Sequence, residues 1–307
     1  MKTNIFSNKI TGIILALVVC ALWGSLFPLI KVGYDAFGIS GSDIPSVILF
    51  AGSRFVICGL ILIVMESIRG KKIDIPKHGS HLIIFVAAFL TIILHYSFTY
   101  IALAVGDGGK SAIIKQVGFL FLSCFAFLFD KNDRFTIRKM FSAVLGFAGI
   151  IVTNLDGTGF SFGLGDFLLI LASFCSCIGM VVSKNATKRV SPVQLVAYSQ
   201  FEGGIFLLIC GWIMGGHFEI ADIRGMLVFS YICIASIAAY VLWNTLVKYN
   251  NLSKLSVIKF TEPLFAVIFS GIILSEDIFK VSYIGAFVII LCSVLVMYGA
   301  KECKKNE

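Results

Sequence analysis

The sequence predicts an all-α membrane protein whose ten transmembrane helices form two inverted five-helix repeats, with both termini in the cytoplasm. Composition is the first reason: 58% of the 307 residues are hydrophobic and 14% are charged, whereas a soluble domain is about 45–50% apolar and about 25% charged. The second reason is a succession of ten apolar stretches joined by short polar connections. The third is that basic residues collect in alternate connections, as the positive-inside rule describes.

Each apolar stretch is long enough to cross a bilayer, because about 20 helical residues span the hydrocarbon core. The five helices of the first half are expected at residues 10–32, 45–66, 78–105, 108–129 and 136–154. Those of the second half are expected at residues 163–183, 192–214, 225–248, 253–275 and 279–300. The connections contain glycine, asparagine, aspartate or lysine, and none is long enough to hold a soluble domain.

The charges of the connections predict how the chain is oriented. Connections on one side are rich in lysine and arginine, whereas those on the other side collect acidic residues. Positive connections stay in the cytoplasm, so we expect a multi-pass protein of the cell membrane with both termini inside. The net charge of +8 is spread over these connections, which argues against a nucleic-acid partner. The basic side holds, for example, Arg69, Lys71, Lys72, Lys77, Lys131, Arg134, Lys184, Lys188 and Arg189, and the acidic side holds Asp35, Asp43, Asp107 and Asp156.

A weak internal repeat relates the two halves. Residues 100–152 align with residues 243–295, which superposes two helices together with their connection. Each half contains an odd number of helices, so the second half enters the membrane upside down relative to the first. Inverted repeats around a central binding site are a recurring architecture of transporters. We therefore expect two five-helix units at residues 10–154 and 163–300.

The expected ninth helix carries two charged residues and a proline inside the membrane. Lys259, Glu262 and Pro263 fall in the first half of residues 252–277. A lysine or glutamate at mid-membrane costs about 2.5–3.5 kcal/mol on insertion scales, so such residues usually face a cavity or a partner. The proline removes a helical hydrogen bond and loosens the preceding turn. We interpret this combination as a binding site; the alternative is that the two charges, three residues apart, only neutralise each other.

Three sequence patterns resemble one family of membrane carriers. They are Ala21-Leu-Trp-Gly-Ser-Leu-Phe-Pro-Leu-Ile-Lys31, the pair Arg54-Phe55, and Glu262-Pro-Leu-Phe followed by Leu274-Ser-Glu-Asp277. Together they make the chain similar to the EamA type of the drug/metabolite transporter superfamily over residues 10–300. The resemblance implies ten helices in two inverted repeats and a secondary carrier, often an exporter, of amino acids, amines, nucleosides, sugar conjugates or drugs. One departure is Lys115-Gln-Val-Gly118, where the family often has a proline in its fourth helix.

Two further polar residues, His95 and Lys115, are candidates for substrate binding or coupling. His95 lies on one helical stripe with Thr91 and Thr99. Histidine exchanges protons near neutral pH, so His95 serves either as a relay or substrate ligand, or as a packed core histidine. Lys115 and Lys259 lie at mirrored depths in the inverted repeats, which suits a substrate that carries a carboxylate.

Aromatic and helix-weakening residues form a second group of candidates. Tyr240, Trp243 and Asn244 share one helix face and suit an amphipathic substrate, although each ring can simply pack between helices. Trp23 and Pro28 indicate a locally weakened first helix, which serves as a gate or merely as a packing notch.

Glu202 lies near the middle of the expected seventh helix, and Arg54 lies near the middle of the equivalent second helix. The repeat therefore permits an ion pair between Arg54 and Glu202 across the pseudo-two-fold axis. The alternative for Arg54 is a structural role, in which it ties helix ends or carbonyl groups together.

These features favour a secondary carrier that works by alternating access around a central polar cavity. The alternatives are a membrane-embedded enzyme, such as a prenyl or phospholipid transferase, and a facilitative channel-like permease. An enzyme of that class requires clustered aspartates or a nucleophile–base pair, and the acids inside these helices are isolated, so we expect no enzymatic activity. A channel requires rings of like residues in an oligomer, whereas the buried charges here are scattered and unlike.

The expected partners are a small-molecule substrate, protons and the lipid bilayer, with no metal or cofactor. Amino acids or amines fit a site that combines lysine, glutamate and aromatic rings. Protons are the expected energy source, because the sequence lacks a nucleotide-binding motif and His95, Glu202 and Glu262 are titratable. The nine cysteines have no CxxC spacing and are expected to pack as small hydrophobes. A small-xxx-small pattern at residues 211–215 makes a homodimer an alternative to a monomer.

Overall fold

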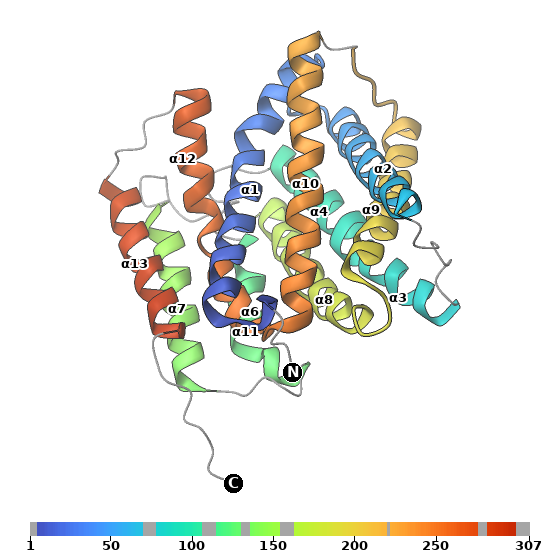
Figure 1. Ribbon diagram of the computed structural model, residues 1–307. Helices are drawn as coiled ribbons and strands as arrows, with labels where there is room; N and C mark the ends of the chain where they lie inside the picture. The colour runs from blue at the N-terminus through green and yellow to red at the C-terminus, as the bar shows by residue number, and fades with distance from the viewer. Residues whose placement is uncertain are drawn as a thin grey trace.

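The structure is a computed structural model, and it describes residues 5–69, 78–105, 115–129, 136–153, 163–219, 222–275 and 281–298 (Figure 1). Every regular element in this part of the chain is a helix, so the predicted all-α class is confirmed. Seven helical stretches are long and apolar enough to cross a membrane. The ten spans and the side of the termini stay predictions. Parts of the fourth, fifth and tenth expected segments, residues 108–114, 154, 279–280 and 299–300, lie outside the described residues.

The helices follow the order of the predicted segments. The first half contains η1 (Ile5–Ser7), α1 (Lys9–Ala36), α2 (Ile44–Ile68), α3 (His78–Ala88), η2 (Phe89–Leu94), α4 (His95–Val105), α6 (Val117–Phe125), η3 (Ala126–Leu128) and α7 (Ile137–Thr153). The second half contains α8 (Leu164–Ala186), α9 (Pro192–Ile213), α10 (Ile223–Tyr249), α11 (Leu252–Lys259), α12 (Glu262–Leu274) and α13 (Val281–Tyr298).

Polar residues of the connections set where several helices begin. Asn8 accepts hydrogen bonds from the backbone N–H groups of Ile10 and Thr11 at the start of α1. Ser191 and Gln194 form a reciprocal capping box at the start of α9. Such caps satisfy backbone donors that the first turn of a helix leaves unpaired.

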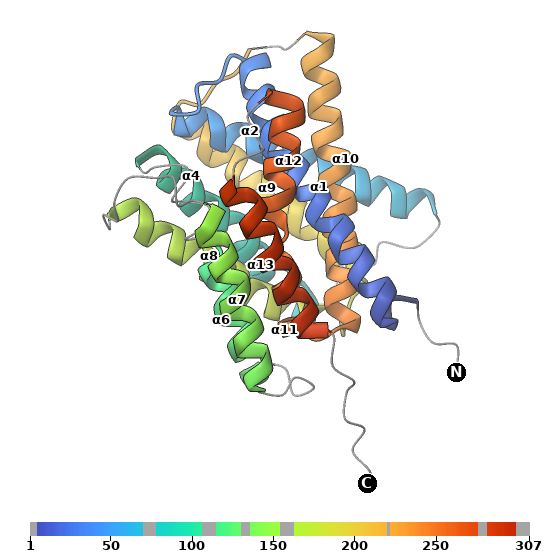
Figure 2. The ribbon, with the colours of Figure 1, turned by 90° about the vertical axis from the view of Figure 1, so that its left-hand side faces the viewer.

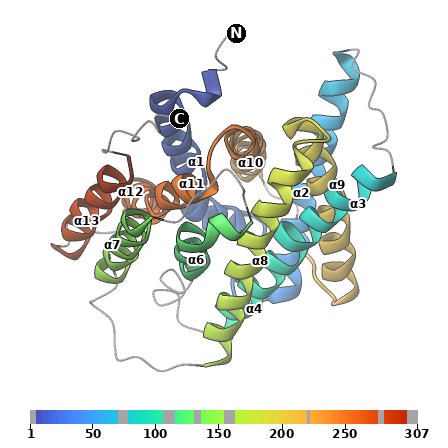
Figure 3. The same ribbon diagram turned by 90° about the horizontal axis from the view of Figure 1, so that it is seen from below.

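The helices of the two halves contact each other in reciprocal pairs. α2 packs along α9 and α7 packs along α13, so helices at equivalent places in the two halves lie together. α1 contacts α10 and α12, whereas α8 contacts α4 and α6, which is the same set of contacts with the halves exchanged. The turned view shows α7 and α13 side by side (Figure 2). In the view from below, α7, α12 and α13 lie on one side of α1 and α10 (Figure 3). The helices α2, α3 and α9 lie on the other side.

Three helical stretches are interrupted. The turn η2 is π-helical and separates α3 from α4. Gln116 is a non-helical residue directly before α6, and Phe260 and Thr261 separate α11 from α12. The last interruption ends two residues before Pro263, near where the sequence predicts a loosened turn. Irregular backbone at membrane depth is tolerated where it is buried in protein or lines a cavity, so the three interruptions indicate where a site lies.

Hydrophobic and polar side chains are distributed in the reverse of a soluble protein. Large apolar side chains are exposed on the outside of the helices, with exposed fractions of 71% for Trp212 and 77% for Ile223. Arg54 and Lys259, in contrast, are only 2% and 7% exposed. This arrangement fits a protein whose outer surface is solvated by lipid and whose polar groups face an interior space.

Glycines allow α2 and α9 to cross at close range. A Cβ placed on Gly204 would lie 2.5 Å from the backbone nitrogen of Val56, and one on Gly211 would lie 2.6 Å from that of Leu49. Small residues let helix backbones approach closely inside membranes. Gly211, predicted as part of a small-xxx-small pattern, therefore serves helix packing within the chain.

Gly204→Ala is expected to lower the thermal stability of the protein, because overpacking of a tight contact costs about 1–3 kcal/mol. Gly285→Ala in α13 is the matched control, since its added Cβ would lie 3.7 Å from Val152, an ordinary contact distance. Thermal unfolding of the purified protein in detergent measures both variants. Equal midpoint temperatures would contradict the close α2–α9 crossing.

Candidate functional site

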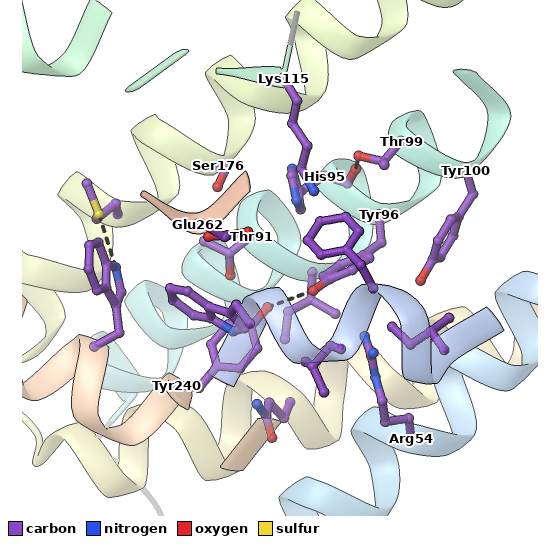
Figure 4. Close-up of a pocket in the computed structure, with 18 of the residues that line it drawn as sticks. Arg54, Thr91, His95, Tyr96, Thr99, Tyr100, Lys115, Ser176, Tyr240 and Glu262 are labelled. Carbon is purple, nitrogen blue, oxygen red and sulfur yellow. Dashed lines mark hydrogen bonds between the residues drawn. The ribbon is translucent and has the colours of Figure 1, made fainter. Parts of the chain in front are cut away.

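A cavity of about 400 Å³ lies where the interrupted helices meet (Figure 4). Residues of α1, α2, η2, α4, α6, α8, α9, α10, α11 and α12 line it, so both halves of the chain contribute. Most of the candidates from the sequence share this one space. They are Trp23, Arg54, His95, Lys115, Tyr240, Trp243, Asn244, Lys259 and Glu262.

The two prolines singled out in the sequence do not line the cavity. Pro28 is buried inside α1, which is helical without interruption from Lys9 to Ala36, so no break accompanies it. Pro263 lies in the first turn of α12, where a missing backbone N–H breaks no helical hydrogen bond. Its effect is therefore to define where α12 begins.

Glu202 also lies outside the cavity, and its partner differs from the predicted one. Its Oε1 lies 2.7 Å from Nε2 of His81 in α3. The guanidinium of Arg54 instead lies over the rings of Phe55 and Tyr96, at 4.4 Å and 5.6 Å from their centroids. The physical reason is the α2–α9 crossing: glycines occupy its closest contacts, and the two charged side chains contact α4 and α3 instead. The expected Arg54–Glu202 pair is thus corrected to a His81–Glu202 contact.

The ammonium group of Lys259 is enclosed by aromatic rings and one carboxylate. It bonds to Glu262, and its Nζ lies 3.4 Å from the ring centroid of Trp23, 5.2 Å from that of Trp243 and 5.4 Å from that of Phe119. Lys259 ends α11 and Glu262 begins α12, so each charge complements the partial charge of its helix end. The two predicted charges therefore pair with each other and also face the cavity.

Arg54 extends into the cavity among tyrosine side chains (Figure 4). Tyr96, Tyr100 and Tyr240 are among the titratable groups around it, and the hydroxyls of Tyr96 and Tyr240 lie 3.0 Å apart. Nε of Arg54 has no hydrogen-bond partner in the described part of the chain. Within the described ranges, no carboxylate pairs with Arg54 or with Lys115. The cavity therefore contains two cations, Arg54 and Lys115, that no described carboxylate neutralises.

The side chain of Lys115 reaches toward the ring of His95 (Figure 4). Nδ1 of His95 lies 3.0 Å from the carbonyl oxygen of Ala172. Because a carbonyl only accepts hydrogen bonds, Nδ1 carries the ring proton and donates it, and Nε2 is left as an acceptor. The ammonium group of Lys115 also lies 5.5 Å from the ring centroid of Phe27. His95 thus combines one structural hydrogen bond with one nitrogen that is available for a proton or a solute.

Several buried polar atoms of the lining have no hydrogen-bond partner among the residues that the structure describes. Buried polar groups are nearly always satisfied by protein or by ordered water, and a cavity with several such groups holds water when it is large enough. The unsatisfied atoms therefore indicate that water or a polar solute occupies this space. They are Nε of Arg54, Oε1 of Gln116, Oγ of Ser199, and both Oε1 and Nε2 of Gln200.

The sequence-based candidates omit part of this lining. Tyr96 and Tyr100 lie one position beyond the His95–Thr99 stripe, but the cavity covers a wide enough arc of α4 to include both stripes. Their i, i+4 spacing was a usable signal. Gln200 carried no such signal, because which face of α9 meets the cavity depends on how the helix is rotated.

Comparison with known proteins identifies the family. Residues 10–155 and residues 163–298 each match the EamA-like transporter family. The chain belongs to this family. The predicted resemblance is confirmed, and the protein is a membrane transporter of the EamA type.

EamA-type relatives cover almost the whole chain. YvbV of Bacillus subtilis, an uncharacterized transporter, is 28% identical over 96% of this chain and 93% of its own length. YedA of Escherichia coli, an uncharacterized inner membrane transporter, is 24% identical over 91% of this chain and 88% of its own. An S-adenosylmethionine/S-adenosylhomocysteine transporter of Chlamydia muridarum is 23% identical over 83% and 82% of the two chains. A protein of known crystal structure shares the fold, with a TM-score of 0.76 and 15% identity over 94% of this chain and 96% of that one.

Double-mutant cycles test the revised partner of Glu202. His81→Gln and Glu202→Gln are expected to be non-additive, with a coupling of about 0.5–3 kcal/mol, because the two side chains are in contact. Arg54→Gln and Glu202→Gln share no contact and are expected to add within about 0.5 kcal/mol. Unfolding of the purified variants in detergent measures both cycles. The reverse pattern would restore the Arg54–Glu202 pair.

Proposed function

We propose that this EamA-family protein is a secondary active transporter that exports small metabolites such as amino acids by alternating access, coupled to protons. The observation that carries the proposal is the cavity described above, to which both halves contribute residues and whose Arg54 and Lys115 have no carboxylate partner in the part of the chain that the structure describes. A solute that carries a carboxylate supplies the missing negative charge.

Alternating access requires two bodies that rock against each other around a shared site. The proposed bodies are the five-helix units at residues 10–154 and 163–300. Their support is the reciprocal pairing of helices, in which α1 contacts α10 and α12 as α8 contacts α4 and α6. Support also comes from the breaks at Gln116 and at Phe260, which belong to the fourth and ninth expected helices, equivalent places in the two halves.

The lining favours amino acids and their derivatives over simple amines. Arg54 and Lys115 offer positive charge, whereas Glu262 is the one carboxylate among the described lining residues and is paired with Lys259. Tyr96, Tyr240 and the tryptophans offer flat apolar surface with polar edges. The Chlamydia relative agrees with this class, because S-adenosylmethionine carries the amino and carboxylate groups of an amino acid together with an adenine ring.

Protons are proposed to couple transport to the membrane gradient. Nε2 of His95 and the carboxylate of Glu262 are the two proton acceptors of the described lining that a solute can approach. Glu202, the third titratable candidate, lies outside the cavity against His81 and is given no part in coupling. Protonation of Glu262 would release Lys259, which links the proton to the state of the binding site.

The proposed topology has ten spans, both termini in the cytoplasm and a location in the plasma membrane. Its support is the positive-inside distribution of lysine and arginine and the seven apolar stretches that are long enough to span. Figure 1 shows that α1 begins and α13 ends at the same end of the molecule, as an even number of spans requires. The protein works as a monomer or as a homodimer.

Proteoliposomes test the carrier proposal. Vesicles preloaded with one unlabelled amino acid from a panel of the common amino acids should take up the labelled form by saturable counterflow, because a carrier exchanges solute across its shared site. With a proton gradient, net accumulation should follow, and a protonophore should abolish it. Uptake of amino acids and amines that never exceeds protein-free vesicles would contradict the proposal.

Arg54→Gln and Lys115→Gln are each expected to raise the KM for amino acids about tenfold, which corresponds to the loss of one charge-assisted contact of about 1.4 kcal/mol. Lys188→Gln is the matched control, since that lysine is exposed beyond the end of α8, outside the cavity lining, and bonds to the side chain of Asn185. Counterflow rates over a range of amino-acid concentrations measure all three variants. If the KM values of Arg54→Gln and Lys115→Gln equal that of the Lys188→Gln control, the proposal that the cavity binds the carboxylate of the substrate is wrong.

A further inference from the structure

One cation-binding cluster of the cavity is already filled by a side chain of the protein. The ammonium group of Lys259 lies against the faces of Trp23, Trp243 and Phe119 and bonds to the carboxylate of Glu262. The rings of Trp23 and Trp243 also contact each other at an angle, with centroids 5.4 Å apart, so they form a defined corner. We call these three rings and the Glu262 carboxylate the cage.

The cage has the chemistry of a site for an organic ammonium group. Aromatic faces attract alkylated cations through their quadrupoles, and tryptophan does so most strongly. The carboxylate supplies the opposing charge. Because Glu262 is the one carboxylate among the described lining residues, an ammonium group that enters the cavity finds its matching partners here. They are engaged by Lys259, however, so such a solute meets an internal competitor.

Two features allow Lys259 to leave the cage. It is the last residue of α11, next to the non-helical residues Phe260 and Thr261, so no continuous helix fixes its backbone to Glu262. Its charge also lies at the end of a flexible four-carbon stem. Two ammonium groups repel each other at contact distance in a poorly solvated site. The cage therefore holds either the ammonium group of Lys259 or a second cation, but not both.

We propose that the cage is the subsite for the ammonium group of the substrate and that Lys259 is its internal occupant, displaced when substrate binds and returning when substrate leaves. The inference rests on the proposed function in one respect, that the cavity is the path of the solute. It gives Lys259 a role beyond neutralising Glu262. Its return to the cage favours release of the substrate.

Binding of tetramethylammonium to an emptied cage tests the proposal. Lys259→Met keeps a long side chain and removes the charge. The chain has three tryptophans, and Trp212 is 71% exposed on α9, so a Trp212→Phe background leaves Trp23 and Trp243 as fluorescent reporters. Tetramethylammonium should change this fluorescence saturably and bind Lys259→Met at least about tenfold more tightly than the Lys259 parent.

Matched variants distinguish the effect of removing the charge of Lys259 from the effect of emptying the cage. Lys259→Arg keeps a cation and should bind tetramethylammonium no better than the parent. Lys259→Met combined with Glu262→Gln empties the cage but removes its carboxylate, and should lose most of the gain. The neutral analogue tert-butanol should give no saturable change in any variant. Equal affinity of Lys259→Met and the parent, or full gain in the double variant, would overturn the proposal.

A measurement on the unsubstituted chain guards against variants that fail to fold. Excess tetramethylammonium should expel Lys259 and raise its labelling by an amine-acylating reagent, relative to the same concentration of sodium chloride. The exposed Lys188 is the internal reference for labelling, read by mass spectrometry. Unchanged or reduced labelling of Lys259 would overturn the proposal. Neither experiment requires flux, so a missing counterflow signal beside an intact cage response counts against the carrier proposal alone.

Discussion

The structure depends on keeping charged groups away from lipid. Arg54 and Lys259 are almost completely buried, whereas large apolar side chains cover the outside. A buried charge is costly unless an opposite charge or aromatic faces compensate it, and at Lys259 the cavity supplies both. The helix interruptions follow from the same constraint, because irregular backbone is tolerated at this depth where it lines a cavity. η2, Gln116 and the residues that flank the α11–α12 break all border that space.

Close contacts at glycines determine where the space remains. A Cβ on Gly24 of α1 would lie 2.6 Å from Cβ of Phe265 in α12, and one on Gly118 of α6 would lie 2.5 Å from the carbonyl oxygen of Ser173 in α8. These are the α1–α12 and α6–α8 contacts, which correspond to each other when the halves are exchanged. The helices touch at these positions and at the α2–α9 crossing, and the cavity lies between them. Glycines therefore determine how closely the helices that line the cavity approach one another.

Much of the fold and part of the site followed from the sequence, because hydropathy and the cost of a buried charge are properties of individual residues. The positions of the described helices and the exposure of Lys259 and Glu262 to a common cavity belong to this group. The partner of Glu202 did not follow, because it depends on the rotation of α9 about its axis, which is set by contacts in three dimensions. Gln200 reaches the cavity for the same reason, and its place in the sequence carries no sign of it.

The break between α11 and α12 has a mechanical consequence. Lys259 is the last residue of α11 and Glu262 is the first residue of α12, and Phe260 and Thr261 join the two helices. A tilt of α12 against α11 that exceeds the reach of the Lys259 side chain separates the two charges. Their separation changes the electric field in the cavity. Movement of α12 relative to α11 and the electrostatic potential in the cavity are therefore linked directly at this break, without a relay of intervening side chains.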